Sequence, residues 1–266
     1  MVDKVKYMEN KFEKAQKVLK EEGVGVFFKK LPRFFKNFLN PVIRKILSKN
    51  KKFVLRKLER FSSTDPIKNY EFITYSLGRM FSPIQIREEF LKLLQVFKDA
   101  NPGVIMEIGT ANGGALFCFA RSAPRDATLI SIDLPEGKFG GGYPAEKIPF
   151  YEAFARPGQS LSLLREDSHD PETLKRAKEI LGNRQIDFLF IDGDHSYEGV
   201  KKDFETYSLL VRKGGIIAFH DVAPKGIPEL TGGVPRFWKE ISGNYKNQSI
   251  VKDADQSGYG IGILFA

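Results

Sequence analysis

Cysteine is scarce in this sequence: Cys118, within the apolar stretch 115–120, is the only one in 266 residues. A single thiol excludes a disulfide framework and a multi-cysteine zinc site, and it is typical of a reducing compartment. Long apolar runs are also missing. The sequence has no stretch of 18 apolar residues, which is about the length that a helix needs to span a bilayer. Charges recur every few residues at the N-terminus, where a secretory signal needs an apolar core. We therefore expect a cytoplasmic protein.

Positive charge is concentrated at the N-terminal end. Residues 1–60 hold 18 lysines and arginines against 6 acids, whereas residues 61–266 hold 24 against 27. The basic character therefore belongs to the first segment, and we do not expect the rest of the chain to bind nucleic acid. We divide the chain into a basic, amphipathic helical extension, residues 1–80, and a main domain, residues 81–266.

The extension contains one apolar stripe at helical spacing, in residues 26–47, with lysines and arginines between its members. Pro32 and Pro41 indicate two helices rather than one. Such a stripe fits two roles. It could pack on the main domain or on a second copy of the chain, giving a homo-oligomer. It could also lie on an anionic membrane surface as a peripheral contact.

From residue 104 onward, apolar runs of strand length alternate with helical stretches. This pattern predicts an α/β fold with a doubly wound, mostly parallel sheet, which binds ligands beyond the carboxyl ends of its strands. The segment 135–158, with three glycines at 140–142, is long for a simple connection and is predicted to be a mobile loop or lid. The predicted strands are Val104–Ile108, Thr128–Ile132, Leu161–Leu164, Ile186–Ile191, Gly215–Phe219 and Gly260–Phe265.

The first strand leads into a glycine-rich turn, "EIGTANGG", with the spacing E-x-G-x-x-x-G over Glu107, Gly109 and Gly113. Glycines there let backbone N–H groups and a helix N-terminus come close to a ligand. The spacing differs from the dinucleotide fingerprint G-x-G-x-x-G, so it favours a nucleoside with a compact polar tail over a pyrophosphate. A plain glycine-rich turn is the alternative.

Polar groups also follow the next two strands. Asp133 lies about 20 residues after the glycine turn, where an acid can accept hydrogen bonds from ribose hydroxyls. Asp167, Ser168 and His169 could bind the edge of an adenine. They could equally belong to a helix start before Pro171, for which Asp170 is the best-placed capping residue. Together these strand ends indicate a nucleoside ligand.

The fourth strand runs into "DGDHSYEGV", which places Asp192, Asp194 and His195 at the edge of a buried run. Such residues are costly there unless they bind a cation or move a proton. The alternative is an ordinary turn, since Asp-Gly is common turn chemistry.

These motifs, together with "GGIIAFHDV" at 214–222, resemble the class I S-adenosylmethionine-dependent methyltransferases. Within that class they are most similar to the small-molecule O-methyltransferase branch that holds catechol-type and antibiotic-sugar enzymes. The resemblance covers about residues 80–266. It implies a seven-stranded Rossmann-like sheet, with the N-terminal helical extension outside it. It also implies methyl transfer from S-adenosylmethionine to a hydroxyl of a small molecule or saccharide, assisted by a divalent metal such as Mg²⁺ or Mn²⁺.

The resemblance also implies roles for individual residues. His195, three positions after Asp192, corresponds to the catalytic base, and Asp192 shares in catalysis. The metal ligands would be Asp192, His220 and Asp221, and a histidine in this set suits Mn²⁺, Fe²⁺ or Zn²⁺ better than Mg²⁺. Asp194 is expected to support a ligand without being one. The cofactor-binding residues would be Glu107, Gly109, Thr110, Asn112, Gly113, Asp133, Asp167, Ser168 and Asp192.

Three other functions compete with this one. A nicotinamide-dependent oxidoreductase would also use Asp133, but it should show a tighter glycine fingerprint and needs no acids after the fourth strand. A nucleic-acid methyltransferase would explain the basic segment, but the aromatic and proline motif that holds a flipped base is replaced by 191–194. A homologue that binds the nucleoside without catalysis is the third.

Overall fold

The computed structural model describes residues 50–135 and 142–266, and the structural statements below concern these residues. The apolar stripe of residues 26–47, and the membrane contact predicted for it, lie outside them. Within the described part, no helix is both long enough and apolar enough to cross a membrane. Residues 51–266 form one unit with its own core.

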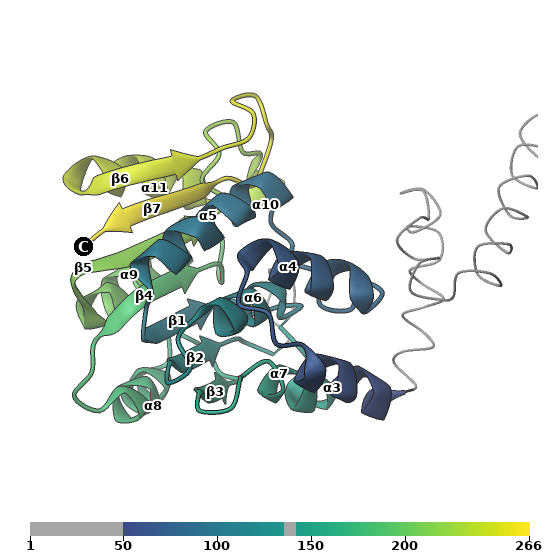
Figure 1. Cartoon of the computed structure of the whole chain (residues 1–266). Coiled ribbons are helices and arrows are strands. Elements are labelled where there is room, and N and C mark those ends of the chain that lie inside the picture. Colours follow the sequence, from purple (N-terminus) through teal and green to yellow (C-terminus); the bar gives the residue numbers. More distant parts are fainter. Residues whose placement is uncertain (1–49, 136–141) are drawn as a thin grey trace, which may run out of the picture. The chain divides into compact units, whose positions relative to one another are not determined.

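The core is a seven-stranded sheet in the order β3-β2-β1-β4-β5-β7-β6 (Figure 1). β1 to β5 are parallel to one another, and β7 runs antiparallel to both β5 and β6. This confirms the predicted doubly wound, mostly parallel fold. The strands are β1 (Val104–Ile108), β2 (Thr128–Ile132), β3 (Ser160–Leu164), β4 (Ile186–Ile191), β5 (Val211–His220), β6 (Lys246–Ile250) and β7 (Ile261–Phe265).

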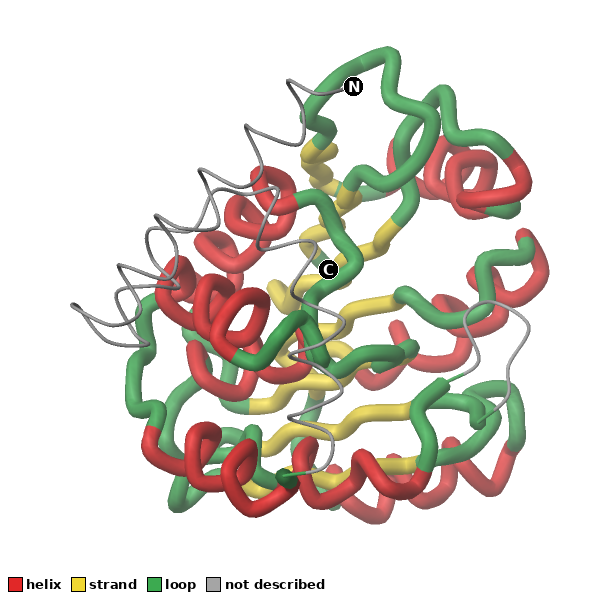
Figure 2. The backbone as a smooth tube through the Cα atoms, turned by 90° about the vertical axis from the view of Figure 1, so that its right-hand side faces the viewer, coloured by secondary structure: helices red, strands yellow, loops and turns green. Residues whose placement is uncertain are grey.

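Helices lie on both sides of the sheet (Figure 2). α8, α9 and α11 contribute their buried side chains to one apolar cluster with β1, β4 and β5, and α5 and α6 cover the other face. The helices before and within the sheet are α3 (Lys51–Arg60), α4 (Pro66–Glu71), the π-helix η1 (Phe72–Ser76), α5 (Arg87–Ala100), α6 (Gly114–Ser122), η2 (Ala145–Lys147) and α7 (Ile148–Glu152). Those that follow are α8 (Pro171–Leu181), α9 (Tyr197–Tyr207), η3 (Ser208–Leu210), α10 (Pro228–Thr231), α11 (Val234–Ile241) and η4 (Ser242–Asn244).

The central strand β4 shows why its sequence is a continuous apolar run. Leu189 and Ile191 join the cluster with α8, α9 and α11. Phe188 points the other way, and its ring lies 4.8 Å from that of Phe97 on α5 and 5.1 Å from that of Phe119 on α6, measured between centroids. Alternate side chains of a strand face opposite sides, so a strand covered on both faces has no polar face.

The segment 143–158 is built into the fold, which corrects its prediction as a mobile loop or lid. It contains η2 and α7, and Phe150, Tyr151 and Phe154 are buried. The buried Arg121 guanidinium donates to the carbonyl oxygens of Ala153 and of Leu58 near the end of α3. The predicted loop therefore has a helical, aromatic half, which its three neighbouring glycines concealed.

Candidate active site

β1 and β4 come very close at their carboxyl ends. The Asp192 amide donates to the Ile108 carbonyl over 2.8 Å, and Gly109 follows at φ +90°, a left-handed conformation. A Cβ at Gly109 would stand 1.9 Å from the Asp192 carbonyl oxygen, so only glycine fits. The strand order reverses between β1 and β4, and open α/β sheets bind ligands at that point.

A cavity of about 270 Å³ opens beside this contact. Gly109, Asp133, Asp167, Ser168 and Asp192, all predicted to bind the cofactor, line it. Glu107, Thr110, Asn112 and Gly113 are not part of its lining. The lining comprises Ile108, Gly109, Ala111, Ile132, Asp133, Leu134, Gly142, Glu166, Asp167, Ser168, His169, Asp192, Gly193 and Asp194.

Asp133 follows β2 and is largely buried at the wall of this cavity. Its Oδ2 accepts a hydrogen bond of 3.1 Å from the Ala111 amide. Burial raises the pKa of Asp133 to about 6, although the backbone amides of Ala111, Thr110 and Tyr143 act in the opposite direction. A carboxylate held in this way can accept hydrogen bonds from a diol in the cavity.

The remaining predicted cofactor residues surround the start of α6. Glu107 is fully buried, and neither carboxylate oxygen has a hydrogen-bond partner of good geometry within the described residues. Burial raises the pKa of this acid well above its usual value. The hydroxyls of Thr110 and Ser131 bond to each other. Asn112 Oδ1 accepts from Lys147 Nζ at 3.5 Å.

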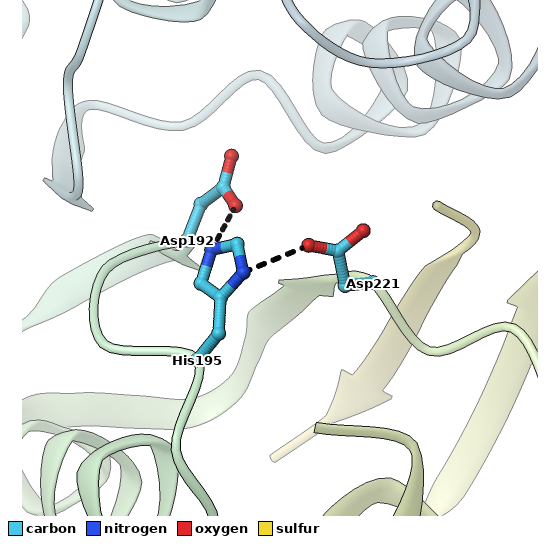
Figure 3. Close-up of side chains that lie close together, drawn as sticks. All are labelled: Asp192, His195 and Asp221. Atoms are coloured by element: carbon cyan, nitrogen blue, oxygen red, sulfur yellow. Dashed lines mark ion pairs between the residues drawn. The ribbon is translucent and has the colours of Figure 1, made fainter. Parts of the chain in front are cut away.

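Asp192, His195 and Asp221 gather where β4 and β5 end (Figure 3). His195 lies between the two carboxylates, with Nδ1 3.1 Å from Asp221 Oδ2 and Nε2 3.5 Å from Asp192 Oδ1. One ligand atom from each side chain lies within 4.8 Å of the other two, a spacing that could hold a metal ion. Two carboxylates and an imidazole suit Mn²⁺, Fe²⁺ or Zn²⁺.

His220, the third predicted ligand, is not a member of that group. Its Nδ1 lies 3.0 Å from Asp192 Oδ1 and 3.5 Å from Asp221 Oδ2. Its buried Nε2 has no hydrogen-bond partner within the described residues. The fold therefore brings all the predicted metal and catalytic residues together, and the group whose spacing could hold a metal ion contains His195 in place of the predicted His220.

Charge coupling within the cluster is strong. Burial pushes the pKa of Asp192 upward, but His220 and His195 outweigh it and hold the pKa at about 2. Burial lowers the pKa of His220, but the carboxylates of Asp192 and Asp221 outweigh it and raise that pKa. The pKa of Asp221 is raised, chiefly by burial. Asp192 is therefore the anchoring negative charge of the site.

The turn residues beside the cluster have local roles. Asp194 Oδ1 accepts from the Ser196 amide at 2.8 Å, and Ser196 Oγ accepts from the Gly199 amide at 3.0 Å. Ser196 is thus the N-cap of α9, and the cap does not involve the His195 side chain. Asp194 binds within its own turn while also lining the cavity.

Two residues of the site carry no signal in the sequence. Gln85 precedes α5 and donates from Nε2 to Asp192 Oδ2 at 2.7 Å. Asp203 is a fully buried acid on α9 that contacts Ser168 and His169. Neither belongs to a motif, since only the fold brings them to the strand ends.

The comparisons with known proteins support the resemblance found in the sequence. Residues 106–222 match a family model described as "Methyltransferase domain". The match covers 117 of the 266 residues, and it indicates a methyltransferase domain in this part of the chain. Among the structures with the same fold is the O-methyltransferase TomG from Streptomyces achromogenes, in complex with SAM. The two share 18% identity and a TM-score of 0.51 over 76% of this chain and 88% of TomG.

Two sequence relatives each match about half of the chain. An uncharacterized protein of Acanthamoeba polyphaga mimivirus is 36% identical over 116 residues, which are 44% of this chain and 50% of that protein. Caffeoyl-CoA O-methyltransferase 1 of Zea mays is 26% identical over 148 residues, which are 51% of this chain and 51% of that protein. The chain spans about half, or less, of the length of the curated relatives it matches.

Proposed function

We propose that the methyltransferase domain transfers a methyl group from S-adenosylmethionine to a hydroxyl of a small molecule or saccharide. One observation carries the proposal. Asp192 lines the cavity beside the glycine turn and also belongs to the cluster with His195 and Asp221. In this proposal the cofactor site and the proton-accepting site share Asp192, which suits methyl transfer to a hydroxyl.

Several features fit a nucleoside cofactor with a charged tail. Gly109 leaves its backbone bare at the cavity, and Asp133 offers a carboxylate to a ribose diol. Glu107 has two unpartnered oxygens, as expected of an acid whose cationic partner is a ligand. When bound, S-adenosylmethionine supplies an electrophilic methyl group on a sulfonium. The chain's own task is to hold donor and acceptor in line and to receive the acceptor's proton.

We assign to His195 the role of taking the proton from the acceptor hydroxyl. Its Nδ1 lies 3.1 Å from Asp221 Oδ2. Both ring nitrogens face a carboxylate oxygen, and we assign the proton to Nδ1 because Asp221 Oδ2 is the nearer of the two; this assignment leaves Nε2 as the accepting atom. Nε2 faces the Asp192 side of the cluster, next to the cavity wall. An acceptor hydroxyl entering there would give its proton to Nε2 as the oxygen attacks the methyl carbon.

A divalent metal fits the same cluster. Asp192 and Asp221 would hold it, with His220 as the third ligand of the proposal, and it would lower the pKa of a bound hydroxyl. In the alternative arrangement His195 is the third ligand, which the geometry of the triad supports. The two roles of His195 exclude each other at any one ring nitrogen, because a nitrogen that binds a metal cannot accept a proton.

The proposed acceptor class rests on the family resemblance, and the caffeoyl-CoA O-methyltransferase of Zea mays supports a small-molecule hydroxyl. Because the comparisons find methyltransferases, they do not favour the alternative of a nicotinamide-dependent oxidoreductase. A homo-oligomer, a cytoplasmic location and a peripheral membrane contact through residues 26–47 stay predictions from the sequence.

The proposal is tested first at the cofactor. Calorimetry should detect binding of S-adenosylmethionine, and Asp133→Ala should weaken it by about 1.5–3 kcal/mol, the range for hydrogen bonds to a charged group. Asp126→Ala, an exposed acid before β2, is the matched control. A methyl-release screen over sugars, phenols and lipid-linked saccharides, with and without divalent metal, then identifies the acceptor. Unchanged binding by a folded Asp133→Ala variant would remove ribose recognition.

A further inference from the structure

Asp203 contacts two loops that line the cavity, the loop after β3 and the loop after β4. It is fully buried on α9. Its Oδ1 accepts a hydrogen bond of 2.6 Å from Ser168 Oγ and lies 3.2 Å from His169 Nε2. Its Oδ2 lies on the side of Gly193, where a Cβ would be 3.4 Å away. Ser168, His169 and Gly193 all line the cavity, whereas Asp203 does not.

These contacts fix where two protons are. A serine hydroxyl has one proton and two lone pairs. Because Ser168 gives its proton to Asp203, its oxygen can only accept a hydrogen bond from a ligand. His169 Nε2 faces two acceptors, Asp203 Oδ1 and the Gly199 carbonyl oxygen at 3.2 Å, so Nε2 carries a proton. Tyr207 holds the loop independently, since its hydroxyl donates to the Ser168 carbonyl oxygen at 2.9 Å.

We propose that Asp203 is a positioning residue that sets which nucleobase the cavity binds. The Ser168 hydroxyl donates its only proton to Asp203, so the Ser168 oxygen is left as a hydrogen-bond acceptor facing the cavity. This inference rests on the proposed binding of an adenine nucleoside. The exocyclic amino group of adenine is a donor and matches such an oxygen. In hypoxanthine a carbonyl oxygen takes that place, and two acceptors would face each other. An unmatched polar group in a closed site is a strong basis for rejection.

The test compares S-adenosylhomocysteine with S-inosylhomocysteine by calorimetry on the full chain. The wild type should bind the adenine compound at least about tenfold more tightly. Asp203→Leu removes the acceptor, so the Ser168 hydroxyl can turn its proton toward either base, and the ratio should fall toward one. Ser168→Ala should lose the discrimination in the same way.

Two variants serve as matched controls. Asp203→Asn can keep its amide oxygen toward both donors and place its NH₂ where Oδ2 has no partner, so it should retain the ratio. Tyr207→Phe loosens the same loop without releasing the Ser168 proton, so it should also retain the ratio. These controls separate the effect of the hydrogen bond from Ser168 to Asp203 from the effect of a less stable loop.

The outcomes are distinct. A folded Asp203→Leu variant with the wild-type ratio overturns the inference, and so does discrimination that survives in Ser168→Ala. If Asp203→Leu does not fold, ¹⁵N NMR of the His169 ring in the wild type decides, because a ring protonated on Nδ1 and not on Nε2 contradicts the network. Failure of the wild type to bind either compound overturns the proposed function itself. Equal binding of both compounds by the wild type overturns the specificity alone.

Discussion

Gln85 and Asp192 lie 107 positions apart in the chain, and Gln85 Nε2 donates a hydrogen bond of 2.7 Å to Asp192 Oδ2. The two carboxylate oxygens of Asp192 therefore have different partners. Oδ2 is held by the segment before α5, and Oδ1 faces His195 and His220. Gln85 thus orients the acid on which the active-site cluster depends.

Gln85→Met is therefore expected to slow methyl transfer. Methionine keeps the length of the side chain but removes the amide, and a hydrogen bond to a charged group contributes about 1.5–3 kcal/mol, so kcat should fall by about tenfold or more. Gln85→Glu should be worse, because a second carboxylate would stand against Asp192. Gln95→Met is the control, since Gln95 makes the same kind of bond to Asp99 on the exposed face of α5. A wild-type kcat for Gln85→Met at saturating cofactor would contradict this orientation role.

Gly109→Ala tests the close approach of β1 and β4. Gly109 and Gly182 both have positive φ, so alanine is strained at either position and should lower stability in both variants. Only at Gly109 would the new Cβ meet backbone, whereas nothing lies within 4 Å at Gly182. Urea unfolding should show a clearly larger loss for Gly109→Ala, and its binding of S-adenosylhomocysteine should fail. Equal, small losses in the two variants would mean that the strands can move apart.

Glu107→Gln should change how stability depends on pH. Burial raises the folded-state pKa of Glu107 well above the unfolded value of about 4.3. An acid whose pKa is higher in the folded state binds its proton more tightly when the protein is folded. The stabilisation present at low pH is therefore lost as pH rises from about 4.3 through the folded-state pKa. Glutamine does not titrate. The stability of Glu107→Gln relative to wild type should therefore increase with pH over that range in urea melts, and parallel profiles would argue against it.

The sheet could be predicted from the sequence because strands covered on both faces leave continuous apolar runs. Six of the seven strands were found in this way. β6 was missed because Lys246–Ile250 is mostly polar and exposed at the edge of the sheet. The run Tyr143–Phe154 was misjudged because the glycines at 140–142 suggested a loop, whereas its aromatic side chains build part of the core.

The site was predictable to the extent that it lies on strand ends. Asp133, Asp192 and Asp221 follow apolar runs, so each could be found along the chain. Gln85 and Asp203 act from helical segments, through contacts that exist only once the sheet has formed. That His195 stands closer than His220 to the spacing of a metal site could not be foreseen either, because it depends on how two neighbouring loops turn.

Metal removal should separate transfer from cofactor binding. Excess chelator is expected to abolish methyl transfer and to leave the calorimetric binding of S-adenosylhomocysteine intact, since His195 and Asp221 lie outside the lining of the cavity proposed for the cofactor. Mn²⁺ should restore activity better than Mg²⁺, because a histidine is available as a ligand. Asp221→Asn should raise the Mn²⁺ concentration needed for half-activation, whereas Asp194→Asn, which keeps its bond to the Ser196 amide, should not. Full turnover in chelator would give the acids another role.

His195→Ala is the most direct test of the proton's path. A general base contributes about 10²–10⁴-fold to the rate, so kcat should fall by that factor while S-adenosylhomocysteine binding is kept. Ser196→Ala is the matched control: Ser196 caps α9, so its loss should cost about 1 kcal/mol of stability without a specific effect on the rate. Mn²⁺ titration of the same variant decides between the two roles of His195. Unchanged Mn²⁺ affinity with a low kcat identifies the base, and a large loss of affinity identifies a metal ligand. A near wild-type kcat with only a lowered Tm would return His195 to a purely structural role.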